Sequence, residues 1–161
     1  MINDNNNNLF TKLAYGDLSE VQALLKSEVN IDEHKNEYGD TALFHALFLG
    51  DLKRAKLLLE YNASPNIQDN YGQTILYKLV LSNSIDKMEF LLQNAANIDL
   101  EIKNDHGFTP LYSSVLDGNI EAIELLISKI CCIYTFFWIP AYAGRHCCVD
   151  LFIRHCEEIT K

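Results

Sequence analysis

The sequence predicts an all-α solenoid of stacked helix-turn-helix repeats joined by β-turn loops. Three turn-like segments (38–43, 71–76 and 106–111) align on a glycine that recurs after 33 and then 35 residues. Each segment is followed by two apolar helical stretches with a short break between them, and a further copy of the second stretch starts at residue 18. A supersecondary unit that recurs with a period of 20–50 residues is the signature of a repeat architecture.

The first helix of each unit carries start signals. The turn glycine permits a backbone conformation that a side chain disfavours, and the threonine two residues later can accept hydrogen bonds from free backbone N–H groups. These glycines are Gly39, Gly72 and Gly107, and the threonines are Thr41, Thr74 and Thr109. Pro110 suits the first helical position, where a missing N–H costs nothing. We expect helices near 9–15 and 18–27, 41–49 and 52–61, 74–82 and 85–94, and 109–116 and 119–128.

The second helix of each unit shows one apolar face. Between the paired helices lie Gly50, Asn83 and Gly118, which can adopt the left-handed conformation that ends a helix. Apolar residues then recur at three- and four-residue steps, as in Leu52, Ala55, Leu58 and Leu59, and in Ile120, Ile123, Leu126 and Ile127. The charged residues Lys53, Arg54, Lys56 and Glu60 are interpreted as the solvated face of such a helix.

The segments Gly107-x-Thr109-Pro110-Leu111 and 62–66 (Asn-Ala-Ser-Pro-Asn), with the Leu-Leu helices, resemble the ankyrin repeat over about residues 9–130. The resemblance implies a polar Asn-rich N-terminus (1–8), an N-terminal capping repeat (9–36), repeats 37–69 and 70–104, a partial repeat 105–130 and a non-repeat tail (131–161). One departure concerns the family's histidine after Pro-Leu, which is Phe44, Tyr77 and Tyr112 here. Since that histidine normally supplies hydrogen bonds between repeats, we expect a more apolar interface.

Composition excludes several functional classes. The formal net charge is −9, which disfavours binding to nucleic acid because the phosphate backbone repels an acidic protein. There is no run of 18 apolar residues, no signal-peptide pattern, and no phosphate loop, nucleophile elbow or H-E-x-x-H motif. His45 and the other histidines are scattered, so His45 is expected to be a packed or solvated residue. We therefore predict no enzyme activity and no cofactor.

The tail differs in composition from the repeats. It contains all five cysteines (Cys131, Cys132, Cys147, Cys148 and Cys156) and the single tryptophan, Trp138. Adjacent cysteines lack the C-x₂-C spacing of structural zinc sites, which predicts free thiols in a reducing compartment and no metal. The apolar run 130–143 is too short to span a bilayer; it could pack on the last repeat or contact a membrane interface. Residues 137–144 also resemble the translated product of interspersed repeat elements in bacterial genomes, which implies inserted sequence and a truncated array.

The resemblance implies a protein–protein interaction module that binds through a concave face and projecting turn tips. Carried over by position, the candidate contact residues at the tips are Glu37, Tyr38, Asp40, Asn70, Tyr71, Gln73, Asp105, His106 and Phe108. On the inner helices they are Phe48, Leu49, Leu81 and Leu116, with Ser82 and Asp117. The partner would be another protein, and one role that the family implies is that of a bacterial effector acting on a host protein. The cytoplasm is the favoured location, with secretion into a host cell as the other. Two alternatives stay open: a decayed or truncated repeat gene product without a partner, and a membrane-associated adaptor that uses the tail.

Overall fold

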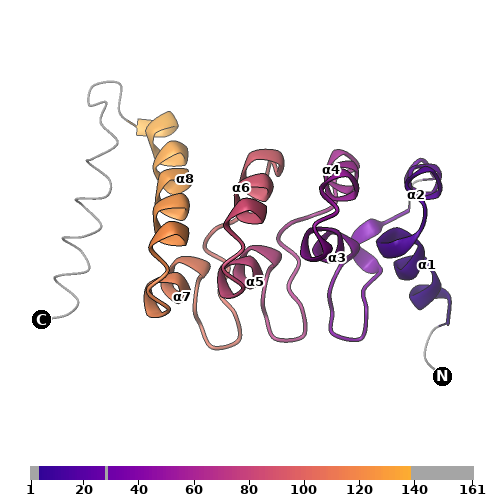
Figure 1. Cartoon of the computed structure of the whole chain (residues 1–161), viewed down its shortest axis with the longest axis horizontal. Helices are drawn as coiled ribbons and strands as arrows, with labels where there is room; N and C mark the ends of the chain where they lie inside the picture. Colours follow the sequence, from indigo (N-terminus) through magenta and orange to yellow (C-terminus); the bar gives the residue numbers. More distant parts are fainter. Residues whose placement is uncertain (1–3, 28, 139–161) are drawn as a thin grey trace, which may run out of the picture.

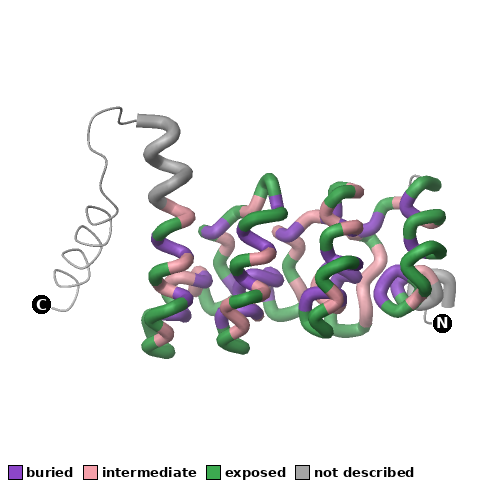
Figure 2. Tube along the Cα trace, turned by 45° about the horizontal axis from the view of Figure 1, so that its top comes forward, coloured by how far each residue is buried: buried purple, intermediate pink, exposed green. Residues whose placement is uncertain are grey.

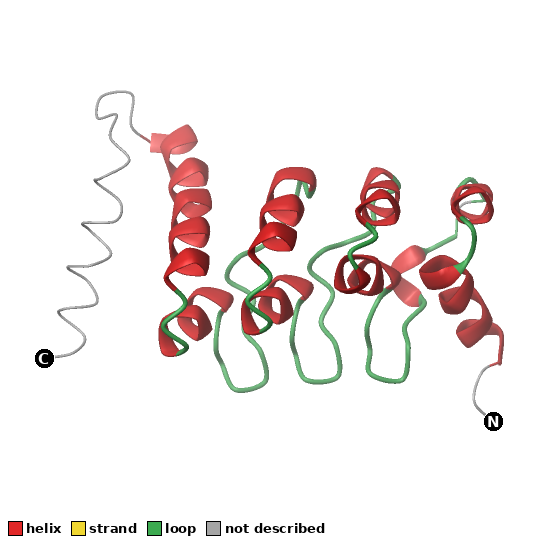
Figure 3. Ribbon diagram, in the orientation of Figure 1, coloured by secondary structure: helices red, strands yellow, loops and turns green. Residues whose placement is uncertain are grey.

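The structure is a computed structural model of the chain and describes residues 4–27 and 29–138, with side chains described for residues 9–27 and 29–130. In these ranges the chain forms α-helices, one short 3-10 helix and no strand (Figure 3). The elements are α1 (Asp4–Tyr15), α2 (Leu18–Leu25), η1 (Ile31–Glu33), α3 (Ala42–Leu49), α4 (Leu52–Glu60), α5 (Ile75–Leu81), α6 (Ile85–Asn94), α7 (Pro110–Leu116) and α8 (Ile120–Trp138).

The helices stack as four antiparallel pairs in two rows. We call α1, α3, α5 and α7 the inner row and α2, α4, α6 and α8 the outer row; in Figure 1 the outer row lies above the inner one and the loops project below it. Contacts run within each pair and between successive pairs, such as α3 with α4, α5 with α7 and α6 with α8. The predicted all-α solenoid is confirmed.

The predicted start signals of the inner helices are confirmed. The threonine hydroxyls of Thr41, Thr74 and Thr109 accept from the backbone N–H three residues later at 3.4, 3.3 and 3.2 Å. Each threonine precedes the first helical residue, so α3, α5 and α7 begin one residue later than expected, and Pro110 takes the first position of α7. The left-handed residues between the paired helices are also found, at Gly50 (φ 78°), Asn83 (φ 49°) and Gly118 (φ 66°).

One apolar core runs through all four helix pairs, and Figure 2 shows buried segments along the whole array. Leu58, Leu91 and Leu126 occupy corresponding places in α4, α6 and α8 and are at most 1% exposed. The predicted apolar faces are too wide at their start, because Leu52 and Ile120 are exposed. Leu52 and Ile120 are the first residues of α4 and α8, one turn before the part of each helix that packs on the inner row. The helical period alone therefore assigns them wrongly to the buried face.

The expectation of a more apolar interface between repeats is wrong at Tyr77. Its ring is buried, and its hydroxyl lies 2.6 Å from Ser113 Oγ of α7 and accepts from Asn104 Nδ2 at 2.9 Å. Both partners are themselves buried. The Tyr77 hydroxyl therefore provides a polar contact between the pairs. We had expected such a contact to be lost with the family's histidine.

Arg54 was expected on a solvated face, and this interpretation is wrong. The residue is buried at 9% exposure, and its guanidinium donates to Leu13 O at 3.2 Å and Gly16 O at 2.7 Å. These carbonyls end α1, so Arg54 satisfies the free acceptors at the C-terminus of a neighbouring helix. Asp51 completes the arrangement: it accepts the Arg54 backbone N–H at 3.0 Å and pairs with Nε at 3.1 Å, which lowers the pKa of Asp51.

Both end helices are longer than predicted. The first helix begins at Asp4, inside the segment 1–8 that was expected to be a polar N-terminus, and α8 continues past 128 to Trp138. The expected end at 128 is therefore wrong, because α8 extends to Trp138, the last residue that the structure describes. The predictions for the rest of the tail, including its packing and its cysteines 147, 148 and 156, lie outside the described residues.

Candidate functional site

Three loops of the same construction precede α3, α5 and α7. We call them the first (36–40), second (69–73) and third (104–108) loop. Each opens on an Asn or Asp whose side-chain oxygen accepts two backbone N–H groups, two and four residues later, at 2.8–3.0 Å. These residues are Asn36, Asp69 and Asn104. The sequence prediction missed them, although they recur with the same 33- and 35-residue spacing as the glycines.

The loops are fixed to one another. Asn70 donates its backbone N–H to Tyr38 O at 3.0 Å and its side-chain amide to Glu37 O at 2.8 Å, while Asp105 N donates to Tyr71 O at 3.3 Å. Gly39 allows this approach, because its φ is +84° and a Cβ there would lie 2.8 Å from Asn70 N. The tips are therefore held in a row with a fixed spacing, below the inner helices in Figure 1.

Most of the predicted tip residues are exposed. Tyr38 and Tyr71 are 54% and 60% exposed, and Glu37, Asn70, Asp105 and His106 are also exposed. The Glu37 carboxylate beside Tyr38 raises the pKa of its phenol. Gln73 is half-buried, and half-buried Phe108 packs with its ring centroid 4.8 Å from that of Tyr112 and 6.3 Å from that of His106.

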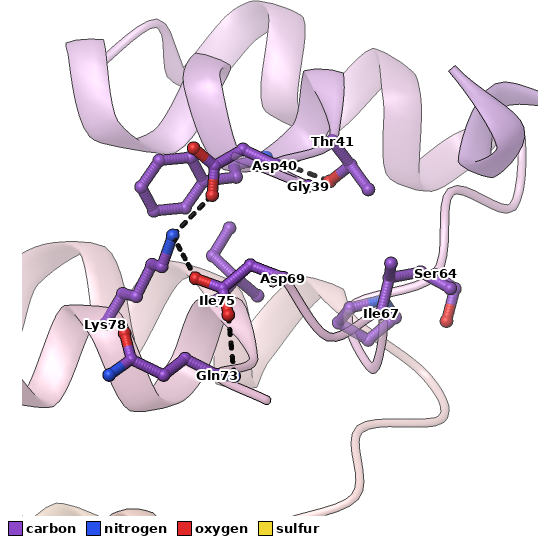
Figure 4. A pocket seen from close by; sticks show the side chains of 11 residues that line it. Gly39, Asp40, Thr41, Ser64, Ile67, Asp69, Gln73, Ile75 and Lys78 are labelled. Carbon is purple, nitrogen blue, oxygen red and sulfur yellow. Dashed lines mark hydrogen bonds and ion pairs between the residues drawn. The ribbon is translucent and has the colours of Figure 1, made fainter. Parts of the chain in front are cut away.

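Asp40 was predicted to be a contact residue at a loop tip, but its side chain does not project into solvent. The residue is buried, and its carboxylate pairs with Lys78 of α5, which also reaches Asp69 Oδ2 at 2.6 Å (Figure 4). Burial alone would lower the pKa of Lys78, but the hydrogen bonds and charges of the two carboxylates raise it above its usual value. The Nζ also lies 4.4 Å from the Phe44 ring centroid, over its face. These three charged residues line a small hollow between the α3–α4 and α5–α6 pairs. Their ion pairs are internal to the array and join the two pairs.

The inner helices end in large exposed apolar side chains. Phe48 and Leu49 in α3, Leu81 in α5 and Leu116 in α7 are 58%, 60%, 50% and 61% exposed. Phe48 stacks on Phe44 with ring centroids 5.6 Å apart, and Lys87 of α6 donates to its carbonyl at 2.7 Å. Phe48, Leu81 and Leu116 occupy the same position in successive units and remain at least half exposed, although Lys87 Nζ of the next pair lies 5.8 Å from the Phe48 ring centroid. We call these four residues the inner-helix stripe.

His45 packs against aromatic side chains of the first two helix pairs. His45 is half-buried between the first two pairs; its Nδ1 lies 3.0 Å from Tyr15 OH and its Nε2 3.1 Å from Asn36 Nδ2. Burial lowers the pKa of His45, with the Asp40 charge opposing and Lys78 adding to that shift. Among the described residues, no three His, Cys, Asp or Glu side chains gather where they could hold a metal ion.

No helix in the part of the chain that the structure describes is both long and apolar enough to cross a bilayer.

Comparison with known proteins identifies the family of this chain. A family model described as ankyrin repeats (3 copies) matches residues 2–69 and 62–136. An ankyrin repeat protein of Rickettsia felis is 72% identical over 103 residues, or 64% of this chain and 34% of that protein. Ankyrin repeat protein L92 of Acanthamoeba polyphaga mimivirus is 35% identical over 76 residues, 47% of this chain and 18% of that protein.

The solved structure of EF0377, an ankyrin repeat protein, has the same fold, with a TM-score of 0.62 and 22% sequence identity over 75% of this chain and 60% of that one. This likeness concerns the fold alone. The chain spans about a third of the length of the Rickettsia felis relative and less than a fifth of the length of the mimivirus protein.

Proposed function

The chain belongs to the ankyrin-repeat family, whose arrays are in general protein–protein interaction modules, and we propose that it binds another protein through the inner-helix stripe and the loop tips. The observation that carries the proposal is the recurrence of exposed apolar side chains at one position in three successive units. Single exposed apolar residues are ordinary on protein surfaces, whereas a repeated row of them marks an interaction site.

The size of the stripe indicates that it acts together with the tips. Each of the four side chains has about half of its surface left to bury, which contributes roughly 1 kcal/mol on contact with a partner. Four such contributions, about 4 kcal/mol, only reach the lower end of the roughly 4–15 kcal/mol that association costs. Tyr38 and Tyr71, both more than half exposed, add the aromatic contacts that dominate many interfaces.

Charge narrows the class of partner. Exposed carboxylates flank the apolar residues: Glu37 and Asp105 at the tips and Asp117 directly after Leu116. Residues 1–130 carry 10 Lys and Arg against 19 Asp and Glu, so the array is acidic as a whole. We infer a partner that presents apolar side chains beside Lys or Arg, because such a surface complements both the stripe and its rim.

The finer proposal is that the chain is a bacterial effector that acts on a host protein. The 72% identity to a Rickettsia felis protein supports a bacterial setting. Capture from a eukaryotic extract but not from a bacterial extract would support this role, and the reverse result would assign the partner to the bacterium.

The test compares the immobilised full chain with two triple variants in a quantitative pull-down. The stripe variant carries Phe48→Ser, Leu81→Ser and Leu116→Ser. Its matched control carries Lys56→Ala, Glu89→Ala and Glu124→Ala, which are exposed residues at one corresponding position of the outer row. Circular dichroism first establishes that the three proteins are equally helical.

We expect one protein to be enriched by the wild type and the outer-row control, and to be reduced at least tenfold with the stripe variant. Equal enrichment by the wild type and both variants would place the binding surface elsewhere. Enrichment of no protein would instead favour the truncated gene product without a specific partner.

A further inference from the structure

The array is open at its C-terminal end. Tyr77 and Val80 of α5 are 4% and 2% exposed because α7 covers them, whereas Tyr112 and Val115, which occupy the same positions in α7, are 49% and 41% exposed. The third loop agrees with this pattern. A Cβ on Gly39 or Gly72 would meet the next loop, but a Cβ on Gly107 would meet no atom within 4 Å among the described residues.

We propose that residues 145–161 of this chain dock on this open end, over Tyr112 and Val115, as an intramolecular cap. The chain reaches the end of α8 at Trp138, and 23 residues follow. In this proposal Pro140 would end the helix and Gly144 would allow a turn. In helical form, the 17 residues after Gly144 would extend about 25 Å, close to the about 28 Å of the 19-residue α8, and so could return along its length.

The pattern of this segment fits a cap. Val149, Phe152, Ile153, Cys156 and Ile159 recur at three- and four-residue steps and define one apolar stripe of an amphipathic helix. Between them lie the charged residues Asp150, Arg154, Glu157 and Glu158, and Lys161 follows Ile159. A terminal unit of a solenoid needs one face that matches the array and one polar face toward water, and this segment offers both.

Charge favours this occupant over a second copy of the chain. Residues 139–161 carry three basic residues (Arg145, Arg154 and Lys161) and three acidic ones (Asp150, Glu157 and Glu158), so the segment is neutral. A second copy would bring another array with nine excess negative charges. Head-to-tail packing of copies on an open end would also be a heterologous contact that does not close.

The cysteine distribution allows a direct test, because the chain has no cysteine before residue 131. In the full chain, Cys131 and Cys132 are replaced by Ser, so that only the cysteines at 147, 148 and 156 remain. A Val115→Cys substitution then places one thiol on the open end, and a Lys56→Cys substitution places one on exposed α4 as the matched control. Mild oxidation with diamide is followed by peptide mapping.

We expect an intramolecular disulfide from position 115 to one of the three tail cysteines, in at least tenfold higher yield than from position 56. Adding Phe152→Ser and Ile153→Ser should abolish the difference without lowering the helicity of the array. Equal yields at both positions, no cross-link from 115, or a link that survives these two substitutions would overturn the proposal. Covalent dimers formed through position 115 would overturn it too, in favour of a second copy.

Discussion

Replacing Tyr77 with phenylalanine removes one oxygen atom from the contact between the α5–α6 and α7–α8 pairs. That oxygen lies 2.6 Å from Ser113 Oγ and 2.9 Å from Asn104 Nδ2, and both groups are buried. The variant keeps the ring, so packing is conserved while two buried polar groups lose a partner. A buried group left without its hydrogen bond costs about 1–3 kcal/mol, and we expect a loss of about 2 kcal/mol in the free energy of unfolding.

Urea unfolding followed by circular dichroism measures this loss. With a slope of about 2 kcal/mol/M, the midpoint should fall by about 1 M. Tyr71→Phe is the control, because Tyr71 is 60% exposed and lies outside the open end, so its loss of an oxygen should change stability by less than about 0.5 kcal/mol. Equal midpoints for the two variants would refute a role of the Tyr77 hydroxyl in holding the pairs together.

Three further predictions concern other contacts. The unfolded His45 imidazole takes up a proton near pH 6.5, whereas the folded one takes it up only at lower pH. The free energy of unfolding should therefore fall as the pH drops from 6.5 through the lower pKa of the folded state. His45→Gln should flatten this dependence, and a pH profile of the variant parallel to that of the wild type would contradict the prediction. Gly39→Ala should lower the free energy of unfolding by about 3 kcal/mol, because the strain of a left-handed alanine adds to a clash with Asn70. Gly107→Ala should lower it by about 1 kcal/mol, from the strain alone. Thermal melts measure the difference, and equal shifts of the two midpoints would disprove the close approach of the loops at Gly39. Leu91→Ala, at a fully buried site, should cost about 2–5 kcal/mol in urea unfolding, and an unchanged midpoint would mean that the core register is wrong.

The sequence predicts well those features that depend on local chemistry. Thr41, Thr74 and Thr109 cap their helices as expected, and every predicted helix exists, because caps, left-handed residues and the helical period act within a few residues along the chain. The exposure of Phe48, Leu81 and Leu116 also follows from their place at the end of a repeated helix.

Contacts between distant residues could not be predicted in this way. Arg54 is buried because carbonyls of α1, 38 and 41 residues away, lie within reach of its guanidinium. Asp40 is buried because Lys78, one unit later, lies against it. A charged residue in a helix or at a turn glycine is most often solvated, and only the neighbouring unit decides otherwise.

Hydrogen exchange of the full chain, with and without its captured partner, tests the central claim most directly. Binding through the inner-helix stripe and the loop tips predicts slower exchange in the three loops (36–40, 69–73 and 104–108) and at the ends of α3, α5 and α7, with α4 and α6 unchanged. Protection confined to the outer row, or to residues 139–161, would contradict the account.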